Sequence, residues 1–194
     1  MRIALLLALL ALSCSTAAVE EKKMDEKIVN QIAETVHKEQ GWKTAEVRVD
    51  EVERLHHGTC SFYTARHKVR PLSYLLNFAL VSGGNIIGMS DELAPGKILK
   101  ACGADAPPAW WAEVITRFHR DLGAGVVLSD AQLNTGATRK IQDAKKEFVP
   151  PKFSDSPEGK TVTYYLLEPE SFAIYNIKAI IAKDGSVTVE RSDL

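Results

Sequence analysis

Possible metal ligands gather in one short stretch of the sequence. His56, His57, Cys60 and His67 all carry side chains that bind zinc in other proteins. On a strand, His56 and Cys60 would share a face but lie about 13 Å apart, at roughly 3.3 Å per residue, while His57 would face the other side. Chelation would need a sharp turn at Gly58 and a fourth ligand from elsewhere. The pattern therefore favours solvated or hydrogen-bonded histidines, and we predict no metal and no other cofactor.

Catalytic chemistry has little support in the residue pattern. Cys60 could act as a nucleophile with a distant histidine as its base, but no family signature surrounds it. The sequence contains no phosphate-binding loop, no glycine-rich dinucleotide fingerprint, no His-Glu-x-x-His and no Gly-x-Ser-x-Gly elbow. The carboxylates within 50–53 alternate with Arg48 and Arg54, which is typical of a solvated strand face. We predict no catalytic residue, and a non-enzymatic protein is the favoured interpretation.

Basic and aromatic side chains supply the candidates for a partner surface. Arg66, Lys68 and Arg70 lie in a polar connection between two predicted strands, where they could bind an anionic partner or form a solvated hairpin loop. Trp110 and Trp111 are neighbours on a predicted helix, so their side chains point about 100° apart. Trp111 lies on the apolar stripe of that helix and is expected inside. Trp110 is expected at a rim, either between two halves of the protein or on a ligand or partner surface.

The N-terminus has the pattern of a secretory signal. Arg2 is followed by an apolar run over 3–12 and then by small residues as far as Ala18. The apolar run, of about ten residues, is too short to span a bilayer of about 30 Å as a helix. We predict a signal peptide at 1–18. Simple cleavage and lipidation of Cys14 in a degraded lipobox both stay open, as does a retained anchor.

Removal of this signal would leave Cys60 and Cys102 as the only cysteines. In an oxidising compartment a disulfide between them is the natural expectation. Such a bond would stabilise the fold by about 4 kcal/mol, because it lowers the entropy of the unfolded chain. Two unpaired buried thiols are the alternative. We predict an exported protein, periplasmic or extracellular, with a lipid anchor if Cys14 is modified.

The charge of the chain limits the classes of partner. The formal net charge is -1 at pH 7. Such a balance argues against nucleic acid, or a membrane surface, held by bulk electrostatics. The expected partner is a protein or another component of the cell envelope. Contact with a membrane is expected only through a lipid on Cys14.

The remaining pattern alternates between helix and strand and predicts an α+β fold of helices packed on antiparallel sheets. Apolar residues every four positions from Met24 to Val36 predict a helix that ends at Gly41. A second helix is predicted from Pro107-Pro108 to Gly123. Strand patterns occupy the ranges 45–49, 60–65, 72–81, 86–89, 126–128, 161–167, 172–182 and 186–190.

A helix followed by a meander of strands occurs twice in this order of elements. The segment 58–65 resembles 159–166, since each has a glycine, a polar residue and a strand pattern with an aromatic pair. We therefore predict a first helix-plus-sheet unit at 19–90, a linker at 91–106, and a second helix-plus-sheet unit at 107–194 with an inserted loop at 130–159. Internal duplication and a chance likeness of short strands both stay open.

Each predicted half resembles a cystatin-like domain, in which an antiparallel sheet wraps one helix. No stretch matches the Gln-Val-Gly or Pro-Trp hairpins of protease-inhibiting cystatins, so no inhibitory residue is implied. The element order is also similar to that of a peptidase-propeptide-like module. The leading hypothesis is a non-enzymatic binding or structural protein of the periplasm or cell envelope.

The competing hypothesis is a small-molecule carrier or an enzyme. It would use a cavity between a curved sheet and its helix, as in folds similar to the nuclear-transport-factor type. Convergent His, Asp or Tyr side chains on the concave face of the sheet would favour this class. A filled apolar core would favour the binding module.

Overall fold

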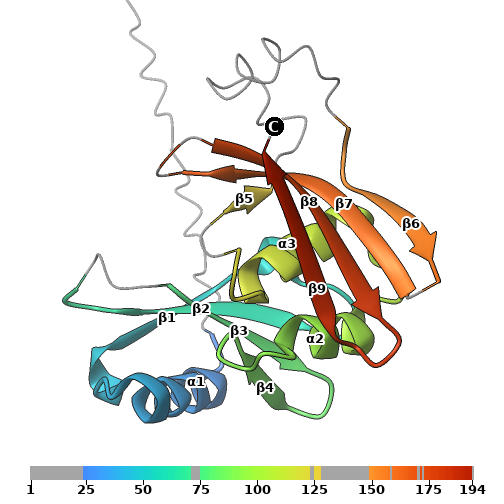
Figure 1. The fold of residues 1–194 in the computed structure, drawn as a ribbon. Coiled ribbons are helices and arrows are strands. Elements are labelled where there is room, and N and C mark those ends of the chain that lie inside the picture. The colour runs from blue at the N-terminus through green and yellow to red at the C-terminus, as the bar shows by residue number, and fades with distance from the viewer. Residues whose placement is uncertain are drawn as a thin grey trace, which may run out of the picture.

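The computed structural model describes residues 24–70, 75–122, 125–127, 149–157, 159–169, 171 and 173–193. The predicted signal peptide at 1–18, with Cys14, lies outside these ranges, as do 71–74 and most of the predicted loop at 130–159. The described residues form an α+β fold with three helices and two antiparallel sheets (Figure 1). The predicted fold class is therefore confirmed. No helix in these ranges is long and apolar enough to cross a membrane.

The first unit begins with α1 (Glu26–Gln40), which covers one face of a four-stranded sheet. The Asp25 side chain caps the helix N-terminus by accepting a hydrogen bond from the backbone N–H of Lys27, at 2.9 Å. Gly41 ends the helix in the left-handed conformation, with a φ of 71°, as the sequence predicts. Ile32 and Val36 are fully buried against the sheet.

The first sheet is an antiparallel meander in which neighbours in sequence are neighbours in space. Two short 3-10 helices, η1 (Thr44–Glu46) and η2 (Glu53–Leu55), flank its first strand. The strands are β1 (Val47–Glu51), β2 (Ser61–His67), β3 (Leu76–Val81) and β4 (Asn85–Gly88).

The second predicted unit also combines one helix, α3 (Pro108–Phe118), with antiparallel strands. Its strands are β5 (Val126–Val127), β6 (Lys152–Ser156), β7 (Gly159–Glu168), β8 (Ala173–Ala182) and β9 (Val187–Asp193). They are arranged in the order β5-β7-β8-β9, and β6 pairs with β7 on the edge that β5 also uses. Both units therefore contain one helix and an antiparallel meander. The finer cystatin-like likeness and the duplication stay hypotheses.

The segment 91–106, predicted as a linker, contains the helix α2 (Ala94–Cys102). Pro95 lies in the first turn, where a helix tolerates proline because the first N–H groups have no partner within the helix. Gly96 lies against the turn between β8 and β9, and a Cβ atom there would overlap the carbonyl oxygen of Gly185. The Pro-Gly pair that looks like a helix breaker thus belongs to a buried helix.

Two further boundaries differ from the prediction. The helix α3 ends at Phe118 and not at Gly123, since the backbone of His119 is already extended. Leu122 is buried although it lies beyond the helix, which explains why its apolar character suggested a longer one. The strand β6 occupies part of the predicted loop at 130–159.

A single apolar cluster fills the interior between the two sheets. The helix α3 lies between the sheets, while α1 covers the outer face of the first one (Figure 1). The cluster joins Phe62 and Ala79 of the first sheet to Ile115 of α3 and to Val162 and Ile177 of the second sheet. The two units therefore share one core.

Candidate functional site

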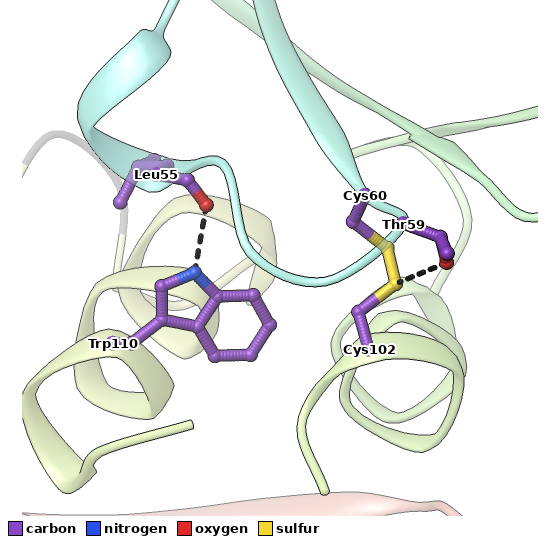
Figure 2. Close-up of a disulfide and its surroundings, with 5 residues drawn as sticks. All are labelled: Leu55, Thr59, Cys60, Cys102 and Trp110. Atoms are coloured by element: carbon purple, nitrogen blue, oxygen red, sulfur yellow. Dashed lines mark hydrogen bonds between the residues drawn. A yellow bond between two sulfur atoms is a disulfide. The ribbon is translucent and has the colours of Figure 1, made fainter. Parts of the chain in front are cut away.

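A disulfide fixes the start of β2 to the end of α2. Cys60 and Cys102 are bonded in the structure, with their Cα atoms 6.0 Å apart (Figure 2). Their residues are only 2 % and 8 % exposed. The predicted cysteine pair is therefore at disulfide distance, and the chain just before β2 is held in place by it.

The residues just before β2 form a tight turn. The backbone N–H of Cys60 donates to the carbonyl of His57 at 2.9 Å, and the N–H of His57 donates back at 3.2 Å. Gly58 adopts the left-handed conformation, with a φ of 56°, which glycine accepts without strain. A sharp turn at Gly58 therefore exists. Within the described ranges, no group of three or more His, Cys, Asp or Glu side chains is arranged to hold an ion.

Trp110 is buried, only 6 % exposed, and not at an open rim; of its two predicted places, it occupies the one between the two predicted halves. Its Nε1 donates a hydrogen bond of 2.7 Å to the carbonyl of Leu55 (Figure 2). Its ring meets Phe62 edge-on, with the centroids 5.8 Å apart, and lies 5.2 Å from the ring of His57. Since α3 lies between two sheets, this face of the helix is covered as well. Trp110 thus joins the two units.

Trp111 is buried too, as its place on the apolar stripe predicts. Its Nε1 donates to the carbonyl of Gly103 at 2.9 Å, just beyond the end of α2. Its ring meets Phe153 of β6 edge-on, with the centroids 5.3 Å apart. The two tryptophans therefore contact different parts of the protein: Trp110 contacts the first unit, and Trp111 contacts the end of α2 and the second sheet.

The basic residues proposed for a partner surface lie elsewhere. Arg66 pairs with Asp50, with Nε and Oδ2 3.3 Å apart, and the Nζ of Lys68 donates to the carbonyl of Ala45 at 2.8 Å. Arg70 is exposed at the edge of a described range. These residues lie at the end of β2 remote from Cys60, a strand length of about 20 Å away. The structure therefore does not bring them together with Trp110.

A pocket of about 450 Å³ opens where the loop after β1 meets the start of α3. We call it the histidine pocket. Its lining residues come from both units: Arg54, Leu55, His56, His57, Pro107, Ala109, Trp110, Glu113, Val127 and Pro151. Most of α3 is buried. Apart from Pro108, its partly exposed residues are Ala109, Glu113 and Arg117, which follow one another at four-residue spacing. Ala109 and Glu113 of this strip line the pocket.

One carboxylate in this pocket faces two guanidinium groups. Arg54 binds Glu113 through both Nη atoms, at 3.2 and 3.4 Å, and Arg117 approaches the same carboxylate at 3.4 Å. Arg117 also donates to the side-chain oxygen of Asn77 at 3.3 Å. Burial lowers the pKa of Arg117, although Glu113 opposes that effect. The side chain of Arg54 remains 61 % exposed, so its outer face stays open to solvent.

The imidazole of His56 has an unsatisfied nitrogen. Its Nε2 lies 3.6 Å from Oε1 of Glu51, too far for a hydrogen bond. This nitrogen is buried and has no hydrogen-bond partner among the described residues. The ring lies 6.5 Å from that of Tyr63, whose pKa is raised chiefly by burial, so its hydroxyl stays neutral. A buried polar atom without a hydrogen bond needs an explanation, and a bound polar group at the adjacent pocket is one.

The N-terminus of α3 adds a positive end to the same pocket. Pro107 caps the helix without any side-chain hydrogen bond, and Pro108 has no N–H to offer. Pro107 and Ala109 both line the pocket, so the first turn faces it. The helix dipole therefore favours negative charge at this wall.

A larger groove of about 570 Å³ lies at the ends of α1 and α3. Its floor includes Phe78, Met89 and Phe118, and its rim includes Glu39 and Glu92. The Oγ of Ser90 already donates to Glu39 at 2.7 Å, so that pair is satisfied. We call this hollow the helix-end groove and regard it as the weaker candidate, because its charged groups stand in solvent around an apolar floor.

The chain matches no protein-family model, and no curated protein or solved structure is significantly similar to it. Function must therefore be argued from the histidine pocket itself. Its lining residues include imidazoles, an arginine and a carboxylate, but no serine, threonine or cysteine that could attack a substrate.

The sequence pointed to three of these residues and missed others. His56, His57 and Trp110 stand out by type, although their meeting does not follow from spacing. Arg54 was interpreted as part of a solvated strand face, and Glu113 was passed over as the only charged residue within 108–116. One signal could have found Glu113. It lies four residues after Ala109, so both residues are on the same face of the predicted helix, away from its apolar stripe.

Proposed function

We propose that the protein is an exported, non-enzymatic binding module whose ligand site is the histidine pocket. The observation that carries this proposal is the filled apolar core between the two sheets. A carrier or enzyme of the competing class needs polar side chains that converge in an internal cavity. The buried polar pair there, Thr116 and Tyr164, is joined by its own hydrogen bond of 3.0 Å. Binding is therefore assigned to the surface.

The histidine pocket suits this role because its walls are held in place before any ligand arrives. The disulfide, the turn at 57–60 and the bond from Trp110 to Leu55 all fix the loop that carries both histidines. A preorganised site loses little entropy on binding. We propose a protein or another component of the cell envelope as the partner.

Export is part of the same proposal. A buried disulfide is typical of proteins that fold in an oxidising compartment. The leader pattern at 1–18 supports a periplasmic or extracellular location, with a lipid on Cys14 as one route to a membrane anchor.

The substitution Ala109→Trp tests the proposed site. Ala109 is exposed and lines the pocket, so a large side chain there should fill the pocket without disturbing the core. Small aromatic and aliphatic probes would be screened by ligand-observed NMR against the mature protein. We expect the probes that bind the wild type to bind Ala109→Trp at least about tenfold more weakly.

The matched control is Ala101→Trp, which adds the same side chain at an exposed position of α2 outside the pocket. It should keep the binding of the wild type. Probes that bind both variants equally well, or that bind neither the variants nor the wild type, would refute the histidine pocket as the ligand site.

A further inference from the structure

We infer that the histidine pocket binds a group of its partner that carries an oxyanion, a carboxylate or a phosphate, on a small apolar body. This inference rests on the proposed function of that pocket and names its ligand class. Three observations point to it: the arrangement of the fixed charges, the two imidazoles, and the apolar walls beside them.

The fixed charges leave a guanidinium available to an anion. Glu113 receives hydrogen bonds from both Arg54 and Arg117, so one carboxylate is shared between two cations. Arg54 keeps its outer face in solvent at the pocket wall. Guanidinium groups bind carboxylates and phosphates through paired hydrogen bonds. An oxyanion can therefore bind Arg54 without displacing Glu113.

The two imidazoles provide donors to the same space. His56 and His57 are adjacent in sequence and both line the pocket. The Nε2 of His56 has no hydrogen-bond partner among the described residues, and the ring of His57 is held against Trp110. A bound oxyanion could accept a hydrogen bond from either ring.

The charge of this pocket depends on those imidazoles. The charged groups on the surrounding elements are Asp25 before α1, Glu51 of β1, Glu53 and Arg54 of η2, and Glu113 and Arg117 of α3. Of these, only Arg54 and Glu113 line the pocket, and their charges cancel. The hydroxyl of Tyr63, beside His56, stays neutral. Histidine changes its charge between about pH 5 and 8, so protonation of either ring makes the pocket net positive. Oxyanion binding should therefore strengthen as the pH falls.

The apolar part of the ligand is set by the remaining walls. Leu55, Pro107, Trp110, Val127 and Pro151 present carbon surface next to the charged groups. The volume of about 450 Å³ lies within the range of sites for small organic ligands. An inorganic anion would leave these walls in water. An aromatic or aliphatic acid would cover them.

Calorimetric titration of the mature protein tests this inference with four probes. Benzoate and phenyl phosphate carry the two oxyanions on one ring, while benzamide and benzylamine are the neutral and cationic controls. Titrations at about pH 5.5 and about pH 7.5 bracket the range of histidine. We expect benzoate, which stays ionised at both pH values, to bind at least about tenfold more tightly at the lower pH. The two controls should bind at least about tenfold more weakly than the better oxyanion.

Variants separate the roles of the side chains. His57→Gln and His56→Gln together should remove the pH dependence, whereas His119→Gln, a histidine of the helix-end groove, should keep it. Arg54→Gln should weaken oxyanion binding about tenfold at both pH values, since one charge-assisted interaction is lost. Circular dichroism would verify that each variant is folded.

The outcomes distinguish this inference from the proposed function. If benzamide or benzylamine binds as tightly as the oxyanions and Ala109→Trp still weakens that binding, the pocket remains the ligand site but the inferred oxyanion ligand is refuted. If Ala109→Trp leaves the oxyanion affinity unchanged, the histidine pocket is refuted as the ligand site. Absence of benzoate and phenyl phosphate binding at both pH values would also overturn the inference. Whichever oxyanion binds more tightly identifies the headgroup.

Discussion

At the scale of single residues, Trp110 connects the loop of the pocket to the core. Its indole N–H donates to Leu55 inside the protein, while its ring supports His57 and packs on Phe62. A buried acceptor that loses its donor costs about 1–3 kcal/mol. The same side chain therefore contributes to stability and to the position of the pocket loop.

We predict that Trp110→Phe lowers the free energy of unfolding by about 1–3 kcal/mol, measured by urea denaturation. Trp111→Phe is the matched comparison, since it also removes one buried donor, to the carbonyl of Gly103. Both variants should lose stability, but only Trp110→Phe should weaken probe binding in the histidine pocket. A Trp110→Phe protein that unfolds at the urea concentration of the wild type contradicts the role assigned to this bond.

The sequence could predict residues whose behaviour depends on type. Cys60 and Cys102 form the expected pair, and Trp111 is buried as its stripe requires. The two places predicted for Trp110, between the halves or on a partner surface, could not be told apart because helical periodicity describes one helix alone. Helical periodicity does not show that a second layer of the protein covers the other side of α3. For the same reason, the sequence did not identify Glu113 as the partner of Arg54.

At the scale of elements, α2 holds the two units together through close backbone contact. Gly96 in its first turn lies against Gly185 in the hairpin turn between β8 and β9. Its last residue, Cys102, is bonded to Cys60 before β2. One short helix thus contacts the second sheet at one end and the first unit at the other.

We predict that Gly96→Ala destabilises the protein, although alanine favours helix over glycine by about 1 kcal/mol. The added Cβ would overlap the backbone of Gly185, which cannot move as a flexible side chain would. Overpacking of this kind costs about 1–3 kcal/mol, so the net change should be a loss in urea denaturation. Lys100→Ala, at an exposed position of the same helix, should stay within about 0.5 kcal/mol of the wild type. A stabilised Gly96→Ala variant would contradict the close contact.

Elements with a strong pattern of their own were predictable. The stop of α1 at Gly41 and the meander of β7, β8 and β9 follow from periodicity and turn residues. At α2 the sequence suggested no more than one short helical turn within 98–102, because Pro95 and Gly96 look like breakers. In the structure Pro95 lies at the helix start and Gly96 at a close contact. The strand β6 has a single large apolar residue, Phe153, and is a strand through its pairing with β7.

At the scale of the whole molecule, the histidine pocket exists only because two units pack together. One wall, 54–57, comes from the first unit, and the other comes from α3, Val127 and Pro151 of the second. Neither unit's sequence pattern contains this site, which is why the site could not be predicted while the fold class could. The shared core holds the two walls at a fixed separation.

The central claim is that ligands bind between these walls, and backbone NMR mapping tests it most directly. Benzoate or phenyl phosphate would be titrated into isotopically labelled mature protein at about pH 5.5, the lower of the two pH values used for calorimetry. We predict that the amide shifts change together at 54–57 and at 109–113, on both sides of the unit boundary. Shift changes centred on the helix-end groove, at Gln40, Phe78 and His119, or confined to one unit, would contradict the account.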